Sequence, residues 1–282
     1  EKITRKVNMK IPLYTYFRNR TLAISGFIND KTYFASLVCA FLLVGCGGSS
    51  NDNDGVVRPD SMLGVWFGNT STVEGGQEEV VIAVSSKGKT IVFSQASRDT
   101  LIAHGDISEG TFTSDDTMLY PGEGMTRHGT MQLTANGGSL EGSATVSGLT
   151  LNFSANKVGV TEDASLIDIA GNYSSSWSDS AYTRSFAIDN EGMISGSDTN
   201  GCVYSGSVEP ISGISSLFDI TIKAEVCFED FEYEGLLAYG VFPFEYQNSI
   251  VERNGIVLAA EASSRAYACL LYTSPSPRDR SI

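Results

Sequence analysis

The strongest constraint on the fold is a recurring alternation between short runs of β-branched or aromatic residues and turns rich in Gly, Asn and Ser. The clearest hairpins turn at Ser86–Lys89 and at Asp189–Gly192. No stretch of 12 residues carries apolar side chains at the 3.6-residue helical period. These patterns predict an all-β antiparallel fold, either a barrel or a sandwich. The clearest strands are expected at 80–84, 90–93, 129–133, 139–146, 149–154, 186–188, 193–195, 203–208, 218–226, 233–241 and 256–260.

A weak internal repeat suggests that this pattern occurs twice. Four short segments in the first half return in the same order in the second half. They are Leu63–Trp66 with Ala170–Tyr173, the Gly88 hairpin with the Gly192 hairpin, Gly105–Ile107 with Gly206–Val208, and Leu140–Gly142 with Tyr233–Gly235. We therefore predict two units of about 100 residues, at 61–157 and 165–262, joined by a linker at 158–164. The alternatives are chance similarity among Gly-rich strands and a single larger sandwich or barrel.

Each predicted unit opens with a Gly-x-aromatic triplet, ending at Trp66 in the first and at Tyr173 in the second. This triplet resembles the first strand of small lipocalin-like and avidin-like barrels, in which the aromatic ring closes one end of the barrel. The resemblance covers three residues per unit. It implies that both rings belong to a core rather than to a ligand site.

An apolar run at 33–45 precedes the predicted units. With about 13 residues it is too short to span a bilayer as a helix, and its length is typical of the apolar region of a signal peptide. The run ends in Leu43-Val44-Gly45-Cys46, which resembles the lipobox of bacterial lipoproteins. That resemblance implies acylation of the Cys46 thiol, removal of a signal peptide at 1–45 and anchoring to a lipid bilayer. The alternatives are an ordinary secretory signal and an uncleaved anchor.

The residues on both sides of the lipobox extend this interpretation. Met9 is the expected translational start, so residues 1–8 are expected to be upstream read-through. Residues 46–60 are rich in Gly, Ser, Asn and Asp and are expected to form a flexible tether. Lipoproteins kept at the inner membrane usually carry Asp after the acylated cysteine, whereas this chain has Gly47. The resemblance therefore favours the outer membrane.

The carboxy-terminal end of the chain has a different character. Residues 269–279 read Cys-Leu-Leu-Tyr-Thr-Ser-Pro-Ser-Pro-Arg-Asp, which resembles the translation of a sequencing-library adapter. We therefore interpret 269–282 as an artefact of a metagenomic assembly and exclude it from the predicted fold. The alternative is a genuine Pro-rich tail.

The charge of the expected mature region excludes one class of partner. Residues 46–268 carry 10 basic and 30 acidic side chains, a net charge of −20, within a whole-chain charge of −14. A surface of this sign repels phosphate backbones, so we expect no nucleic acid partner. It favours solubility and attraction to cationic partners.

The cysteines predict one disulfide. Cys39 lies in the signal, Cys46 is the acylation site and Cys269 belongs to the excluded tail, which leaves Cys202 and Cys227. An even pair in an oxidising compartment predicts a bond, with two free thiols or a metal pair as the alternative.

Strand pairing supports this bond but raises a conflict of side-chain direction. If 203–208 pairs with 218–226 so that facing residue numbers add up to 429, Cys202 meets Cys227. Cys227 then has the parity of the polar residues of its strand. Either the disulfide lies on the solvent face, or a bulge near Glu225 changes the parity.

No catalytic motif is present, and we expect neither an enzyme nor a cofactor. His104 falls in an expected strand and His128 near an expected loop, without a nucleophile elbow, a zinc-protease motif or a phosphate loop. The weak metal candidates are Glu229, Asp230, Glu232 and Glu234, which are more typical of a solvated turn. The favoured function is a non-enzymatic binding or structural module of the cell envelope with an unknown protein or small-molecule partner. The alternatives are a small-ligand- or metal-binding barrel and a hydrolase with a dispersed site.

Overall fold

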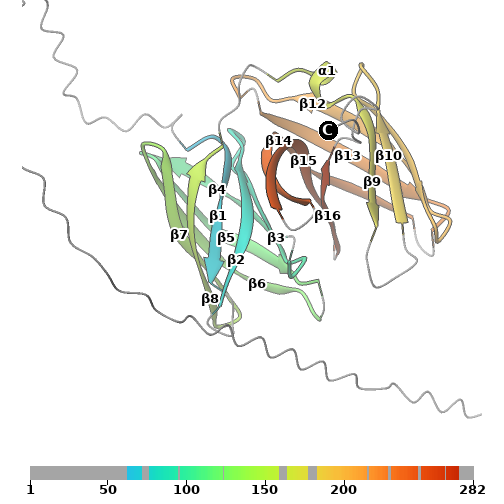
Figure 1. Cartoon of the computed structure of the whole chain (residues 1–282). Coiled ribbons are helices and arrows are strands. Elements are labelled where there is room, and N and C mark those ends of the chain that lie inside the picture. Colours follow the sequence, from blue (N-terminus) through green and yellow to red (C-terminus); the bar gives the residue numbers. More distant parts are fainter. Residues whose placement is uncertain are drawn as a thin grey trace, which may run out of the picture. The chain divides into compact units, whose positions relative to one another are not determined.

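The protein is all-β with antiparallel strands, as the sequence predicts. The computed structural model describes residues 62–71, 76–94, 96–122, 124–158, 164–176, 183–214, 216–227, 230–246, 249–263 and 265–272. Within these ranges, sixteen strands form two eight-stranded sheets, and the helix α1 (Leu166–Ile169) stands between them in the chain (Figure 1). The expected signal, lipobox and tether lie outside the described residues.

The first sheet is a closed up-and-down barrel. Its strands are β1 (Gly64–Ser71), β2 (Gln77–Val84), β3 (Lys89–Ser94), β4 (Thr100–Ser108), β5 (Thr111–Tyr120), β6 (Arg127–Asn136), β7 (Ser139–Val146) and β8 (Leu149–Lys157). Strand β8 pairs with β1, with Gly68 opposite Ala155. A Cβ atom at Gly68 would lie 2.1 Å from the carbonyl oxygen of Ser154. Glycine at this position therefore permits the close approach that shuts the barrel.

The second sheet has the same strand order but remains open. Its strands are β9 (Gly171–Ser176), β10 (Thr183–Ile188), β11 (Met193–Asp198), β12 (Val203–Pro210), β13 (Leu217–Glu225), β14 (Phe231–Tyr246), β15 (Ser249–Ala262) and β16 (Arg265–Tyr272). Within the described residues, no backbone pairing joins β9 to β16. The sheet still curls around its own core, because the Tyr267 ring of β16 lies 5.7 Å from the Phe186 ring of β10.

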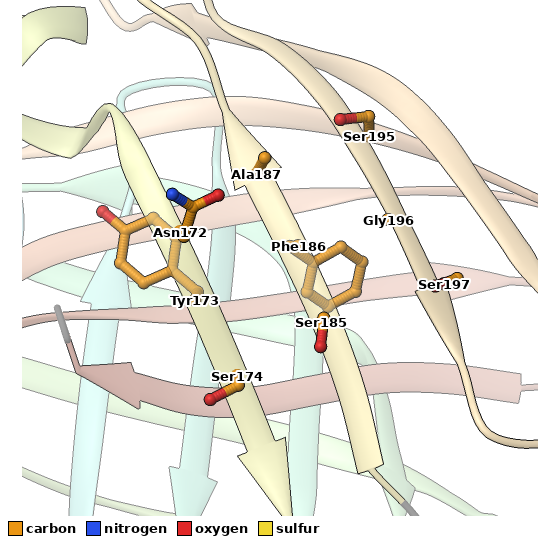
Figure 2. A pocket seen from close by; sticks show the side chains of 9 residues that line it. All are labelled: Asn172, Tyr173, Ser174, Ser185, Phe186, Ala187, Ser195, Gly196 and Ser197. Atoms are coloured by element: carbon orange, nitrogen blue, oxygen red, sulfur yellow. The ribbon is translucent and has the colours of Figure 1, made fainter.

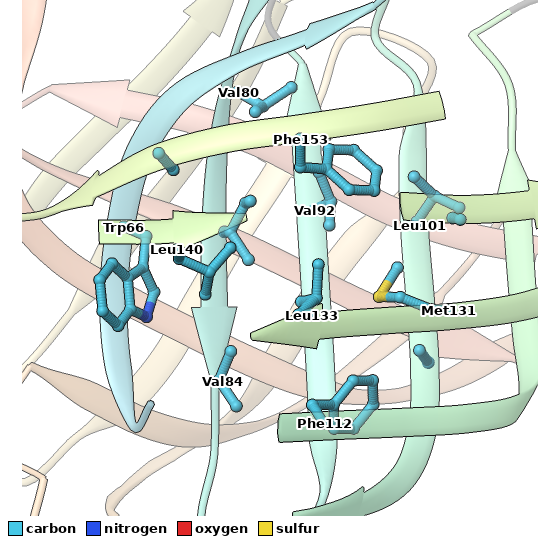
Figure 3. Packing of buried hydrophobic residues seen from close by; sticks show 14 of the residues in the cluster. Trp66, Val80, Val84, Val92, Leu101, Phe112, Met131, Leu133, Leu140 and Phe153 are labelled. Atoms are coloured by element: carbon cyan, nitrogen blue, oxygen red, sulfur yellow. The ribbon is translucent and has the colours of Figure 1, made fainter. Parts of the chain in front are cut away.

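Alternate residues of each barrel strand fill the barrel interior (Figure 3). The cluster contains Trp66, Phe112, Leu133 and Leu140, each fully buried, together with Val, Ala and Met side chains from the other strands. An eight-stranded barrel is just wide enough for side chains to fill it. The interior of this barrel is therefore a packed core.

The aromatic residues at the start of each sheet occupy equivalent positions. The Trp66 Nε1 atom donates to the carbonyl oxygen of Met62 over 3.0 Å, and the Tyr173 hydroxyl donates to the carbonyl oxygen of Ile169 over 2.6 Å. Each ring is almost completely buried, and each acceptor lies four residues upstream. Burial raises the pKa of the Tyr173 phenol to about 12, so it remains a hydrogen-bond donor at neutral pH. Both rings belong to cores, as predicted.

The predicted hairpins are also equivalent. Gly88 and Gly192 have φ values of +74° and +83°, and their carbonyl oxygens accept hydrogen bonds from Gly105 and Val208 respectively. The third predicted correspondence, of Gly105 with Gly206, is therefore displaced by two residues. The two sheets nevertheless confirm the prediction of two tandem barrel-like units.

The fourth predicted correspondence is wrong. Leu140–Gly142 lies on β7, the seventh strand of the barrel, whereas Tyr233–Gly235 lies on β14, the sixth strand of the second sheet. The similarity arises because glycine is needed at both places for the same local reason. A Cβ atom at Gly142 or Gly235 would lie about 2 Å from a carbonyl oxygen of the neighbouring strand.

A third apolar cluster, here called the shared core, joins the outer face of the barrel to the outer face of the open sheet. Strands β2 and β15 are consequently buried on both sides. In β15, Ile256 and Leu258 pack inside the open sheet, while Val257 and Ala259 pack in the shared core. The cluster consists of Val65, Val81, Ala83, Ile91, Phe93, Ile102, Tyr120, Ile211, Ile214, Leu217, Leu236, Ala238, Phe242, Val257 and Ala259.

The last strand lies beyond the predicted end of the second unit at 262. Strand β16 runs from Arg265 to Tyr272 and includes four residues of the segment 269–282 that we excluded. Cys269 and Leu271 are buried in the core of the open sheet because the alternation Tyr267, Cys269, Leu271 has the period of a strand. Residues 273–282 lie outside the described part of the chain.

The predicted disulfide between Cys202 and Cys227 is present, with a Cα–Cα distance of 4.7 Å. The predicted register is wrong by one residue, because Val203 pairs with Glu225 and facing numbers add up to 428. Val226 resolves the parity conflict. It has a φ of +61° and is 74% exposed, so the chain turns after β13 and the next side chain points back. Cys227 then packs beside Cys202 at the edge of the core, which matches the predicted change of parity.

Removal of this disulfide is expected to destabilise the open sheet. The bond closes a loop with a sequence separation of 25 residues. Replacing both cysteines by alanine should lower the free energy of unfolding by about 2–4 kcal/mol, because the unfolded chain regains loop entropy. Urea denaturation of the double variant measures this loss, and wild-type protein under reducing conditions is the matched comparison. Peptide mapping that finds both thiols free in the oxidised protein would contradict the pairing.

Candidate functional site

Both histidines of the chain line the same surface hollow, although they are 24 positions apart in sequence. The hollow has a volume of about 370 Å³ and lies where strands β4, β5 and β6 of the barrel meet the end of β15. Its lining combines two imidazoles, two carboxylates and a phenol with small or apolar side chains. The lining residues are Ile102, His104, Asp116, Met118, Tyr120, His128, Glu261, Ala262 and Ser263.

Glu261 joins the open sheet to the barrel at this hollow. Its Oε1 atom lies 2.5 Å from His104 Nε2, and its Oε2 atom accepts a 2.9 Å hydrogen bond from the Tyr120 hydroxyl. Burial and the neighbouring Glu261 carboxylate both raise the pKa of the Tyr120 phenol, burial being the larger cause. The phenol therefore remains protonated and donates to Glu261 throughout the physiological pH range.

Asp116 lies between the two histidines. His104 on β4 is directly opposite Asp116 on β5, so their side chains share one face of the barrel wall. On the other side, His128 Nε2 of β6 lies 3.4 Å from Asp116 Oδ1. The order across the hollow is thus His128, Asp116, His104 and Glu261.

Two irregularities of the barrel wall give these side chains their direction. The pairing of β4 with β5 shifts after His104, and the pairing of β5 with β6 shifts between Ser114 and Thr117. The buried Ser114 hydroxyl donates to the carbonyl oxygen of His104 over 2.7 Å and accepts from the amide of Asp116 over 3.0 Å. Ser114 thus satisfies backbone groups that the shifted ladder leaves unpaired. Bulges of this kind re-aim side chains and are common beside functional sites.

The described members of the acidic set that the sequence offered as weak metal candidates, Asp230, Glu232 and Glu234, are not grouped as metal ligands. Glu229 lies outside the described residues, and Asp230 is exposed before β14. Glu232 Oε1 lies 3.6 Å from Lys223 Nζ in an exposed ion pair. Glu234 lies directly opposite Glu261 in the pairing of β14 with β15. Within the described residues, no three His, Cys, Asp or Glu side chains are already grouped as metal ligands.

A second hollow, of about 320 Å³, lies over strands β9, β10 and β11 (Figure 2). Its exposed side chains are small and polar: Asn172, Ser174, Ser185, Ser195 and Ser197. Tyr173 and Phe186 also border it but are buried in the core of the open sheet. The described residues that line this hollow include no charged side chain, so they have little to fix the position of a ligand.

A third hollow, of about 450 Å³, lies beside Lys157 at the end of the barrel. Burial lowers the pKa of the Lys157 ammonium, which also lies 5.3 Å from the centre of the Trp66 ring. Ser86, Ser212 and Ser216 supply hydroxyl groups to the same hollow. The arrangement places one cation near hydroxyl groups, and among the described lining residues Lys157 is the only charged one.

Comparison of the chain with models of known families, with curated proteins and with solved structures gave no significant match. Cys46 lies outside the described residues. No helix within the described ranges is long and apolar enough to cross a membrane. Function therefore has to be argued from the geometry of the described residues.

The sequence indicated neither the meeting of the two histidines nor the part played by Glu261. His104 was correctly expected in a strand, and His128 proved to be the second residue of β6. Their position in one hollow depends on two irregularities of strand pairing and on the packing of β15 beside β4, which leave no local sequence pattern. The one usable signal was the rarity of histidine, with two in 282 residues.

Proposed function

We propose that the protein is a lipid-anchored module of the bacterial cell envelope that acts by binding through its outer surface, without catalysis. The anchor is the acylated Cys46, and the outer membrane is the favoured location. The two β units are held away from the bilayer by the tether at 46–60. The partner is a protein or a small molecule recognised at the surface.

The observation that carries the binding part of this proposal is the filled interior of the barrel. Lipocalin-like barrels that hold ligands do so in an internal cavity, whereas this interior is occupied by Trp66, Phe112 and their neighbours (Figure 3). The interior of the open sheet is likewise packed, with rings of Phe186, Tyr204 and Tyr267 in mutual contact. Recognition on the outer surface fits these packed cores better than an internal pocket does.

The contacts of the histidines give less support to a hydrolase. In the described part of the chain, both imidazoles pair with carboxylates, His104 with Glu261 and His128 with Asp116. A serine hydrolase needs an imidazole within hydrogen-bond distance of a nucleophilic hydroxyl. The His–carboxylate pairs fit recognition of a cation more closely than activation of a serine.

Replacement of Cys46 by alanine is expected to abolish lipidation. Because the thiol is the acceptor of the acyl chains, cells given labelled palmitate should show a labelled protein only for the wild type. The unlabelled variant should also leave the outer-membrane fraction, since the packed β units offer no alternative anchor in this proposal. Measurement is by gel autoradiography and by fractionation of the cell envelope.

Cys39→Ala is the matched control because this cysteine lies in the same apolar run, seven residues before Cys46. It should retain both the label and the membrane location. Persistence of the label in the Cys46→Ala variant would refute the anchor. Loss of the label in Cys39→Ala as well would indicate a general failure of export rather than loss of the acceptor.

A further inference from the structure

We propose that His104, Asp116, His128 and Glu261 bind a divalent transition metal ion, for which Zn²⁺ is the probe. The site would join the barrel wall to strand β15 of the open sheet. This proposal does not depend on the lipid anchor. It concerns a hollow on the described surface and can be tested without knowing the physiological partner.

The types of donor indicate this class of ligand. Imidazole nitrogens together with carboxylate oxygens suit Zn²⁺ and neighbouring transition metals, whereas Ca²⁺ and Mg²⁺ prefer oxygen ligands alone. Both histidines of the chain and two carboxylates from three adjacent barrel strands and β15 line one hollow. Side chains directly opposite each other on neighbouring strands have Cβ atoms about 5 Å apart, which is within reach of a common ion.

The four groups form two pairs in the metal-free arrangement. His104 lies 2.5 Å from Glu261, and His128 lies 3.4 Å from Asp116, so no three donors converge. The side chains of His104 and His128 are 44% and 61% exposed. Both rings can therefore turn without disturbing a core. The His128–Asp116 pair contributes little stability because both of its side chains are 61% exposed and solvent screens the interaction, whereas the Glu261 side chain is 21% exposed and its pair with His104 is screened less.

The surroundings of the hollow favour a cation. Glu234 lies directly opposite Glu261 on β14, and Lys89 lies directly opposite His104 on β3. The Lys89 ammonium donates to the carbonyl oxygen of Glu234 over 3.5 Å. Asp116 and Glu261 place two carboxylates in the hollow, and no Lys or Arg is among its described lining residues.

The framework beneath the site is rigid where metal binding requires it. Ser114 and Thr117 are buried, and their hydroxyl groups lie 3.3 Å apart beneath the exposed face of β5. Ser114 also holds the backbone of His104 and Asp116 through the two hydrogen bonds described above. The backbone positions of His104 and Asp116 are thus fixed, and the exposed side chains of Asp116 and both histidines would turn toward Glu261, whose side chain is 21% exposed. Support of this kind is typical of ligands that bind metal well.

Equilibrium dialysis of the purified full-length chain in detergent against ZnCl₂ tests the proposal. The wild type should bind about one Zn²⁺ per chain, and excess Ca²⁺ should not displace it. His104→Ala and His128→Ala should each weaken binding by more than about tenfold, and the double variant should bind none. His128→Ala is the safer single variant, because His128 pairs with Asp116 of the barrel, whereas His104 pairs with Glu261 of the open sheet.

Glu232→Gln is the matched control, because this exposed carboxylate lies on the neighbouring β14 but outside the hollow. It should bind Zn²⁺ as the wild type does. Far-ultraviolet circular dichroism without metal establishes that each variant is folded. Absence of binding by the wild type, unchanged binding by the double histidine variant, or displacement by Ca²⁺ would each overturn the proposal.

Discussion

Trp66→Ala is expected to lower the free energy of unfolding by about 3–5 kcal/mol. The side chain is fully buried in the barrel core and is the largest in it. Its removal leaves a cavity that the surrounding strands cannot close, because β1 pairs on both sides, with β2 and with β8. The variant also leaves the carbonyl oxygen of Met62 without the hydrogen bond from the indole. Urea denaturation followed by circular dichroism measures the change.

Trp66→Phe separates the two contributions. It keeps an aromatic ring in the core but loses the Nε1 donor, and it should cost less than the alanine variant. Tyr173→Ala is the counterpart in the open sheet and should be comparably destabilising, because its hydroxyl makes the equivalent bond to Ile169. A loss below about 1 kcal/mol for Trp66→Ala would mean that the ring does not close the barrel.

The alternation of strands and turns was sufficient to predict the fold class and both hairpins, because these depend on local residue types. The turns at Ser86–Lys89 and Asp189–Gly192 need glycine with positive φ, and the sequence places it there. The Gly-x-aromatic triplets also marked the first strand of each sheet, because this signal too depends on local residue types. The register between paired strands was harder to predict from the sequence. The pairing of β12 with β13 was wrong by one residue, since the loop between them did not fix the register.

The shared core corresponds to two uninterrupted apolar runs in the sequence. Strands exposed on one face alternate apolar and polar residues, but Val80–Val84 and Ile256–Ala260 are apolar without interruption. A continuous run of this kind indicates burial on both faces. Both runs lie where the barrel meets the open sheet, in strands β2 and β15. The uninterrupted runs are therefore consistent with two sheets that cover each other, a packing that the sequence analysis did not predict.

The histidine hollow could not have been predicted in the same way. His104, Asp116 and His128 come together because the pairings on both sides of β5 shift, and such shifts follow from the whole barrel rather than from local residues. Glu261 reaches them from a sheet that begins more than 60 residues after β4. The acidic segment from Glu229 to Glu234 was conspicuous in the sequence by its density alone. A high density of charged residues is typical of solvated turns. It does not indicate whether their side chains meet at one site.

Val257→Asp is expected to lower the free energy of unfolding strongly, because Val257 lies in the packing between the two sheets. This side chain is fully buried in the shared core, between the outer faces of the barrel and the open sheet. Val257→Asp would place a carboxylate among apolar groups such as Leu236 and Ala259, with no cationic partner among the described members of that cluster. Burial of an unpaired charge costs several kcal/mol, so a loss of more than about 4 kcal/mol is expected.

Calorimetry distinguishes the two ways in which the protein can respond. The wild type should unfold in one transition, because the shared core couples the two sheets. In Val257→Asp the barrel should melt separately from the open sheet, since its own core and its closed ladder do not involve residue 257. The Val257→Asn side chain has nearly the same shape as that of Val257→Asp but no charge. This variant should therefore lose less free energy of unfolding.

Met193→Asp is the control for the added charge, because Met193 is 55% exposed at the start of β11. Its free energy of unfolding should change by less than about 0.5 kcal/mol. Equal stability of Val257→Asp and wild type would show that the two sheets do not bury this residue between them. That result would also remove the geometry that brings Glu261 to His104, because β15 carries both Val257 and Glu261. The same measurement therefore tests the contact on which the proposed metal site depends.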